Sequence, residues 1–340
     1  MELIPKVVEK WTKLANTKER IKLFYTPEMQ AVIKIESSTL KGLRKYFEEH
    51  GFVEIVVPHI TKATGACENI ATMFDIDYFG RHAYLTQTGQ LYLEVLSQFL
   101  EKVWCTIHSF RAEPEVDDRH LTEFTLVEME ILGDFETLLR HIENAIFYSV
   151  SEVLRERREE LELLGVDTER LKDFTPPYRK ITYTEAIELL SNEGLEWGDD
   201  LKSRHEKKLV RMLGNKPLFI THYPKKIKFF NMRENPENPE IVNSADLILP
   251  YSGEAVGAAE REHNYERLKE RLLESTMYKM LLERGGSIED FDWYLEFWRK
   301  HEGILHSGCG IGVNRVVQSI LGAPDIRVTT PYPMNRESLF

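Results

Sequence analysis

The chain has 340 residues, of which 42% are hydrophobic and 17 are phenylalanine, enough apolar material for a sizeable core. Its formal net charge of −12 disfavours a polynucleotide partner, because proteins that grip nucleic acid usually present a basic face. The cysteines Cys67, Cys105 and Cys309 are isolated and support neither a zinc site nor a disulfide framework, and without a membrane-length apolar run or a signal-peptide pattern we expect a cytoplasmic protein with no membrane contact.

The N-terminal part of the chain predicts helices and then a strand. Residues 1–24 are charged and amphipathic, which is enough for a short helical extension. Residues 34–50 carry apolar positions at helical spacing, and the helix that they predict would end at Gly51. The apolar run over residues 52–58 predicts a strand that Pro58 terminates.

Residues 110–130, FRAEPEVDDRHLTEFTLVEME, place fixed cations and an aromatic ring around a loop that is too polar for a core. Arg111 and Arg119 can hold phosphate oxygens through planar guanidinium forks. Phe124 can lie on a flat base, and Glu113 can accept a hydrogen bond from an exocyclic amine. The segment therefore suits a nucleoside triphosphate, although an ion-paired hairpin with acidic residues facing both arginines would use the same composition.

The middle of the chain predicts a helical stretch followed by strands. Residues 134–165 have a helical pattern, and their ERREELELL run is typical of a solvated face. Pro176 and Pro177 end this stretch. Between residues 217 and 262, the short runs PLFITHYP, KFFNM, ADLILP and EAVGAAE predict strands of a central antiparallel sheet, and residues 235–239 predict an exposed turn.

A glycine-rich segment, GCGIGVNR, occupies residues 308–315 and precedes an apolar run. Its three glycines would let the backbone approach a ligand closely, and Arg315 would lie at the start of a helix, where a phosphate is favoured. A tight strand-to-helix connection would use the same residues. The segment is not a dinucleotide fingerprint, since no strand with an acidic residue follows about 20 residues on.

Residues 110–130 and 308–315 resemble motifs 2 and 3 of class II aminoacyl-tRNA synthetases, and residues 51–58 resemble motif 1. Other segments match in order, among them YLTQTGQLYLE, LEWGDDLKSRHE, GEAVGAAERE and WYLEF, and the closest likeness is to asparaginyl-tRNA synthetases. The resemblance implies an α+β catalytic domain over residues 25–340, with a central antiparallel sheet flanked by helices and a helical elaboration at residues 134–175. It also implies a homodimer joined through the motif 1 helix and strand.

The same resemblance implies a site for ATP and Mg²⁺. The phosphates would be held by Arg111, Arg119, His120 and Arg315, the adenine by Glu113, Phe124 and Arg315, and the metal by Asp246 and Glu254. Among these residues, Arg111, Arg315 and Glu254 would act directly in catalysis.

The resemblance also implies an amino-acid pocket made by Glu68, Thr88, Gln90, Glu128 and Arg261. Glu68 would pair with the substrate ammonium, and Arg261 would read the side-chain carbonyl or carboxylate. Glu128 matches the glutamate of asparagine enzymes, and Leu93 stands where aspartate enzymes have a lysine, which favours an amide side chain. The chain departs from the family at Ala258, which replaces a glycine, at Asn231, which replaces a tyrosine, and in its C-terminal tail.

From these features we expect an AMP-forming ligase that activates aspartate or asparagine as an acyl-adenylate and passes it to a small amine such as ammonia. The family resemblance begins near residue 25, which leaves no room for the anticodon-binding barrel of asparaginyl-tRNA synthetases. One alternative is a compact asparaginyl-tRNA synthetase that charges tRNA. Another is a catalytically inactive regulatory paralogue, against which the retained Arg111, Glu113, Glu254 and Arg315 speak.

Overall fold

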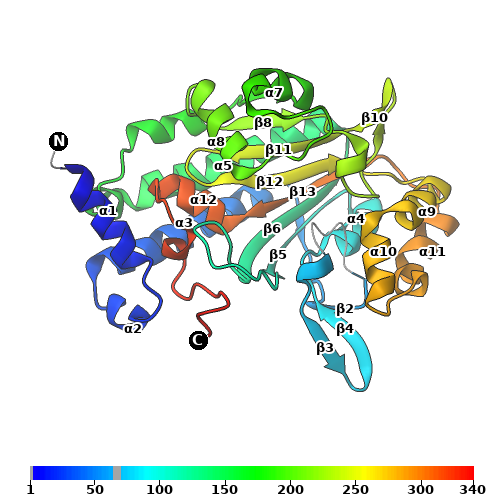
Figure 1. Ribbon diagram of the computed structural model, residues 1–340, viewed down its shortest axis with the longest axis horizontal. Helices are drawn as coiled ribbons and strands as arrows, with labels where there is room; N and C mark the ends of the chain where they lie inside the picture. The colour runs from blue at the N-terminus through cyan, green and yellow to red at the C-terminus, as the bar shows by residue number, and fades with distance from the viewer. Residues whose placement is uncertain (1–2, 64–69) are drawn as a thin grey trace.

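A computed structural model describes residues 3–63 and 70–340, and its centre is an eight-stranded sheet (Figure 1). In spatial order the strands are β1 (Val53–Glu54), β5 (Lys102–Phe110), β6 (Glu123–Leu132), β13 (His306–Gly312), β12 (Gly253–Glu260), β11 (Ser244–Leu249), β8 (Leu218–Thr221) and β7 (Arg179–Thr182). Neighbouring strands are antiparallel except at the two edges, where β1 with β5 and β7 with β8 are parallel. The predicted α+β fold with a central antiparallel sheet is therefore confirmed.

Two small sheets complete the strands. β2 (Ile60–Thr61), β4 (Arg81–Leu85) and β3 (Asp75–Tyr78) form one, and its β3–β4 hairpin projects from the body in Figure 1. β9 (Glu234–Asn235) and β10 (Asn238–Val242) form the other, and the exposed turn between them, residues 236–237, lies within the turn predicted at residues 235–239. The strand predicted over residues 228–232 is wrong, because that segment follows a single 3₁₀ turn, Lys225–Ile227, and makes only an isolated bridge at Met232.

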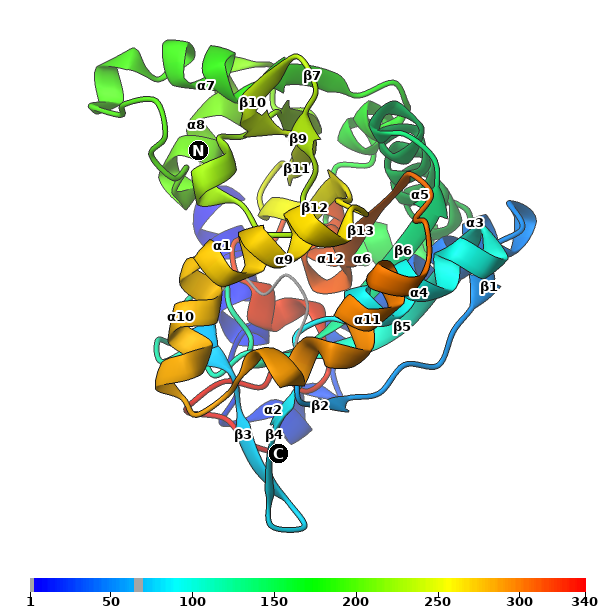
Figure 2. The same ribbon diagram turned by 90° about the vertical axis from the view of Figure 1, so that its right-hand side faces the viewer.

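Helices surround the sheet. They are α1 (Leu3–Leu14), α2 (Arg20–Leu23), α3 (Pro27–Glu49), α4 (Gln90–Leu100), α5 (Phe135–Glu156), α6 (Arg158–Leu163), α7 (Tyr183–Leu189), α8 (Ser203–Met212), α9 (Tyr265–Glu274), α10 (Thr276–Glu283), α11 (Asp292–Lys300) and α12 (Val313–Leu321). Figure 2 shows α9, α10 and α11 side by side at one end of the sheet. Within residues 3–63 and 70–340, none of these helices has the length and apolarity that a bilayer crossing requires.

The N-terminal predictions hold with changed boundaries. α3 begins earlier than its apolar pattern indicated, because the Thr26 side chain accepts a hydrogen bond from the Met29 amide at 3.3 Å and Pro27 suits the first turn. The predicted strand over residues 52–58 is paired in the sheet only at Val53 and Glu54. Beyond this pair the segment continues without a regular ladder, and Val56 is 98% exposed.

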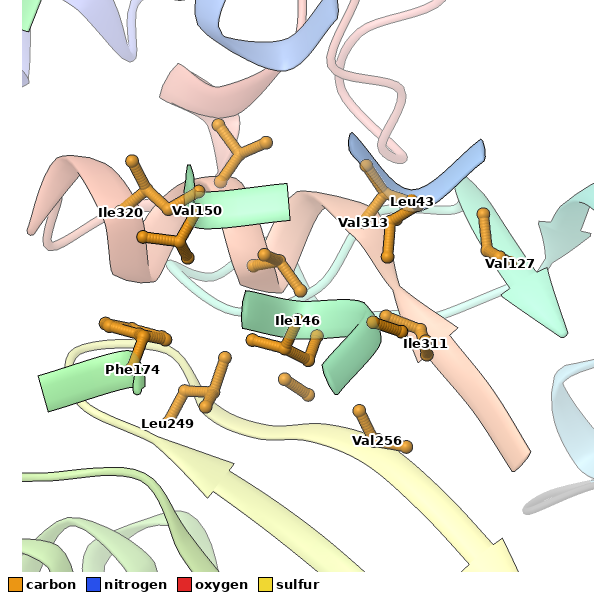
Figure 3. Packing of buried hydrophobic residues seen from close by; sticks show 14 of the residues in the cluster. Leu43, Val127, Ile146, Val150, Phe174, Leu249, Val256, Ile311, Val313 and Ile320 are labelled. Carbon is orange, nitrogen blue, oxygen red and sulfur yellow. The ribbon is translucent and has the colours of Figure 1, made fainter. Parts of the chain in front are cut away.

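One face of the sheet is closed by the main hydrophobic core. Side chains of α3, α5 and α12 pack there, including Leu43, Ile146, Val150 and Ile320 (Figure 3). Because successive side chains of a strand point to opposite faces, β6 directs Val127, Met129 and Ile131 into this core. The intervening residues Leu126, Glu128 and Glu130 face the other side, where the sheet is left open to ligands.

The predicted helical stretch after residue 134 is confirmed as α5, α6 and the 3₁₀ turn Glu169–Phe174, with an interruption at Arg157 between the two helices. The ERREELELL run is only partly a solvated face. Its charged residues lie at the surface or half-buried, whereas Leu161 and Leu164 are fully buried in the main core. The many charged residues of this run led to the prediction of a solvated face, although the short helix also has an apolar side.

Helix α6 offers a matched test of that packing. Leu161 is 0% exposed and Leu163 is 50% exposed, although they lie two residues apart. We expect Leu161→Ala to lower the free energy of unfolding by about 2–5 kcal/mol, because it leaves a cavity in the core. Leu163→Ala should change it by about 0.5 kcal/mol or less, as surface substitutions do. Denaturant unfolding measures both, and equal losses would contradict the assignment of Leu161 to the core.

Candidate active site

A cavity of about 240 Å³ opens on the face of the sheet that the main core leaves uncovered. Its walls combine arginines, carboxylates and glycines from β6, β12, β13, the loop after β5 and the start of α4. The lining residues predicted from the sequence are Thr88, Gln90, Arg111, Arg119, His120, Phe124, Glu128, Glu254, Arg261 and Arg315. The fold therefore brings most of the predicted site together from segments more than 200 residues apart.

Two predicted residues do not line the cavity, and a third is not among the described residues. Glu113 is half-buried on the loop after Arg111 and does not line the cavity. Asp246 is buried on β11 and is not among the residues that line the cavity. Glu68, like Cys67, falls outside the described residues, so its predicted role remains a prediction.

The arginines of the cavity are held by neighbouring backbone and side chains. The Arg111 guanidinium lies 5.3 Å from the centre of the Phe124 ring, a cation–π distance. Arg315 donates from Nη1 to the Ser252 carbonyl at 2.7 Å and from Nη2 to the Arg119 carbonyl at 2.8 Å. Burial, and after it the nearby Arg119, lower the pKa of Arg315 to about 10, so the guanidinium is still charged at neutral pH. A cluster of half-buried cations of this kind favours an anionic ligand.

The loop between Arg111 and Phe124 is shaped by Asp117. One oxygen of its carboxylate accepts hydrogen bonds from the backbone amides of Arg119 and His120, both at 2.8 Å. The other oxygen lies 2.7 Å from His120 Nδ1. Arg119 forms its ion pair with Glu206 of α8, at 3.2 Å, rather than with the acidic residues of its own loop. Arg119 is therefore not paired within a simple hairpin, which was the alternative that the sequence allowed.

Glu128 forms a buried acceptor at the base of the cavity. It is 4% exposed and accepts hydrogen bonds from the Thr88 hydroxyl and, at 2.6 Å, from the Gly89 amide. Burial raises the pKa of the Glu128 carboxyl, while these two hydrogen bonds oppose the rise. Leu93, where aspartate enzymes have a lysine, is fully buried in a separate apolar cluster with Val103.

Arg261 is the centre of a second buried group. Its Nε and Nη2 atoms donate to Glu130 at 3.1 and 2.7 Å, and Glu94 lies 3.9 Å away. Glu94 is completely buried and accepts hydrogen bonds from Gln90 at 2.7 Å and Asn231 at 2.8 Å. The pKa of Glu130 is raised by burial and by the neighbouring Glu94, and lowered by Arg261. Arg261 is thus already engaged along one edge before any ligand arrives.

Glu94, Glu130 and Glu206 are functional candidates that the sequence reasoning missed. Glu130 had a detectable signal, because it lies two residues after Glu128 in a strand and so shares its face. Glu94 lies four residues after Gln90, on the same side of α4. Glu206 lies about 85 residues beyond the arginine that it contacts, and nothing local pointed to that contact.

The carboxylates predicted to hold Mg²⁺ come from the adjacent strands β11 and β12. Glu254 lines the cavity, and Asp246 forms an ion pair with Lys228 at 2.7 Å. Burial raises the pKa of the Tyr223 hydroxyl, and the charges of Asp246 and Glu254 raise it further, so both carboxylates act on this group. Mg²⁺ is usually bound through one or two carboxylates together with substrate phosphates, so this donor set fits the metal. Lys228 would then have to share Asp246.

Gly308 makes room for Glu130. The two residues are opposite each other in the β13–β6 ladder, and a Cβ atom on Gly308 would lie 1.9 Å from Glu130 Oε1. The sequence had assigned this glycine to close approach of a ligand, whereas the structure uses it to accommodate a protein carboxylate. Gly310, the next glycine on the same face, lines the cavity itself.

Comparison with known proteins gives consistent likenesses over most of the chain. The family described as tRNA synthetases class II (D, K and N) matches residues 12–336. The asparagine–tRNA ligase of Pelotomaculum thermopropionicum is 40% identical over 312 residues, covering 91% of this chain and 70% of that protein. That of Pyrococcus furiosus is 37% identical over 319 residues, covering 93% and 70%. The crystal structure of Pyrococcus horikoshii asparaginyl-tRNA synthetase with asparaginyl-adenylate superposes with a TM-score of 0.86 and 36% identity, covering 94% and 72%.

The contact between Gly308 and Glu130 gives a test of the buried group. We expect Gly308→Ala to lower the free energy of unfolding by at least about 1–3 kcal/mol, because the added methyl must displace Glu130 from Arg261. Gly310→Ala is the control, since its Cβ would lie no closer than 3.4 Å to its nearest neighbour, Leu126. Its change in stability should be within about 0.5 kcal/mol. Denaturant unfolding of both variants decides, and equal stability would refute the close contact.

Proposed function

The chain belongs to the class II tRNA synthetases of the D, K and N type, ligases that form aminoacyl-adenylates, and from this premise we propose that it activates asparagine with ATP and transfers it to tRNA. The sequence alone had placed a small amine first among the acceptors and tRNA second. The asparagine–tRNA ligases that share 37–40% of its residues support the second reading better.

The observation that carries the choice of amino acid is the charge of the pocket. Two buried carboxylates, Glu130 and Glu94, lie 2.7 and 3.9 Å from the Arg261 guanidinium, and a third buried carboxyl, Glu128, lines the same cavity. A substrate carboxylate placed against Arg261 would add a further negative charge in a region of low dielectric constant, which is costly. An amide adds no charge, and it can accept from Arg261 and donate to a carboxylate. The pocket therefore favours asparagine over aspartate.

The proposed reaction is the formation of an aminoacyl-adenylate from ATP and the amino acid. An oxygen of the amino-acid carboxylate attacks the α-phosphorus of ATP, and the bond from that phosphorus to the oxygen bridging to the β-phosphate breaks, releasing pyrophosphate. Arg111 would stabilise charge on the α-phosphate, and Arg119, His120 and Arg315 would bind the departing phosphates. Mg²⁺ held by Asp246 and Glu254 would neutralise part of that charge. Phe124 would bind one face of the adenine, and Thr88 and Gln90 would orient the amino acid.

A small amine remains the second candidate acceptor, because the net charge of −12 is unfavourable for contact with tRNA phosphates. In that case AMP release would require aspartate and ammonia and would not depend on tRNA.

A location in the cytoplasm also remains a prediction.

One assay tests the proposed function. AMP formation and ATP–pyrophosphate exchange are measured with each amino acid, with and without ammonia and total tRNA. We expect exchange with asparagine, and aminoacylated tRNA when tRNA is added. Arg111→Ala should reduce exchange at least about 100-fold, because it removes a contact to charge that develops in the transition state. Exchange with aspartate alone, or AMP release that tRNA does not change, would contradict the proposal.

The edge strand of the main sheet supports a homodimer. Val53 and Ile60 are 43% and 44% exposed, and Val56 is 98% exposed, so the segment after α3 presents apolar side chains that a second copy would cover. We expect a dimer in sedimentation at micromolar concentration and dissociation in Val56→Glu. Leu282→Glu is the control, since Leu282 is 48% exposed on α10, which lies across the molecule from β1 in Figure 2. A wild-type monomer would refute this interface.

A further inference from the structure

Glu206 reaches the proposed phosphate site from outside the segments that define it. It lies in the first part of α8, whose start is fixed by a 3.0 Å hydrogen bond from the Lys202 amide to His205 Nδ1. One turn further along the helix, Leu209 and Val210 pack in a hydrophobic cluster with Leu218 and Ile220 of β8. α8 is therefore anchored independently of the cavity, and Glu206 is a fixed rather than a mobile carboxylate.

One oxygen of Glu206 makes two contacts at the cavity. Oε2 lies 3.2 Å from Arg119 Nη2 and accepts a hydrogen bond from the backbone amide of Glu254 at 3.1 Å. The side chains of Glu206 and Arg119 are 8% and 15% exposed, so solvent screens this pair weakly. A single atom of α8 thus touches both a predicted phosphate ligand and the backbone of a predicted metal ligand.

The backbone is shaped around this contact. Gly253 has φ +76°, and a Cβ there would lie 2.6 Å from Glu206 Oε2 and 2.8 Å from Arg119 Nη2. Both the left-handed conformation and the proximity of the two side chains require glycine at this position. The turn that leads into β12 is therefore complementary to the Glu206–Arg119 pair.

The pairing leaves a defined part of Arg119 for a ligand. Glu206 takes Nη2, while the buried Nε–H of Arg119 has no acceptor among the described residues. A buried donor without an acceptor is costly, and an anion in the cavity would satisfy it. The pKa of Arg315 is lowered by the like charge of Arg119 and raised by the opposite charges of Glu206 and Glu254. The Glu206 carboxylate, in contact with Arg119, therefore compensates part of the positive charge of the arginines at this end of the cavity.

We propose that Glu206 is a positioning residue that aims Arg119 at the β- and γ-phosphates of ATP. This inference rests on the proposed ATP site, and it adds a contribution from α8 to a phosphate grip otherwise made by the segments around residues 119 and 315. Glu206 does not touch the nucleotide. It acts on the terminal phosphates alone, because its contacts are with Arg119 and the Glu254 backbone and not with the adenine-binding Phe124.

Binding of Mg²⁺–ATP and of AMP, titrated separately without amino acid, tests the proposal. Because AMP lacks the β- and γ-phosphates, a positioning role predicts loss of ATP affinity with AMP affinity retained. We expect Glu206→Ala to weaken ATP binding about tenfold, the effect of losing one charge-assisted hydrogen bond at the arginine, and to leave AMP binding within about twofold. Glu206→Gln keeps an acceptor for the Glu254 amide and should weaken ATP binding only about threefold.

Glu193→Gln is the matched control. Glu193 also pairs with a basic residue, Lys208 of α8, at 2.5 Å, but on the exposed side and away from the cavity. It should leave both affinities unchanged. Equal weakening of ATP and AMP in the Glu206 variants, or no weakening of ATP in either, would overturn the inference. If the wild-type chain binds ATP but no amino acid drives exchange, the proposed function fails, and the ratio of the two affinities still decides the role of Glu206.

Discussion

The site depends on one guanidinium placed beneath the open face of the sheet. Arg261 is 4% exposed and lies against two carboxylates, Glu130 at 2.7 Å and Glu94 at 3.9 Å. Removing a buried arginine from such a group would leave like charges together without compensation, which is strongly unfavourable. Neighbouring residues hold the two carboxylates in place beside Arg261. Gly308 gives Glu130 its space, and Gln90 and Asn231 donate hydrogen bonds to Glu94.

On the proposed function, this buried group explains how the fold would bind two ligands at once. The alternation of β6 directs Val127, Met129 and Ile131 into the core and Glu128 and Glu130 toward the cavity. Glu94, Glu130 and Arg261 therefore form one charged group of the site, and Arg119, Arg315 and Glu206 form another. On the proposed function, the first group would read the amino acid and the second would bind the phosphates, so that the reacting carboxylate and the α-phosphate would meet between them.

The fold class and most of the residues that line the cavity could be predicted from the sequence. The residues that hold those lining residues in position could not. Arg111, Phe124 and Arg315 could be predicted because motifs keep their chemistry in one short segment. The strand predicted at residues 228–232 failed because a short apolar run there supplies buried side chains from a turn rather than a strand. Glu206 could not be predicted, because its partner is distant in sequence and only the packing of α8 against β11 and β12 brings them together.

The ion pair between Lys228 and Asp246 bears on the order in which ligands assemble. The ammonium lies 2.7 Å from the Asp246 carboxylate and 3.9 Å from the centre of the Tyr223 ring, in a buried position. In the protein without substrate, this fixed cation already compensates a carboxylate that would otherwise attract divalent ions. On the proposed function, free Mg²⁺ would therefore bind only weakly before the nucleotide enters. The metal would then enter on the triphosphate, with nucleotide and ion bound as one chelate, and the enzyme at rest would be insensitive to fluctuations in the concentration of free divalent cation.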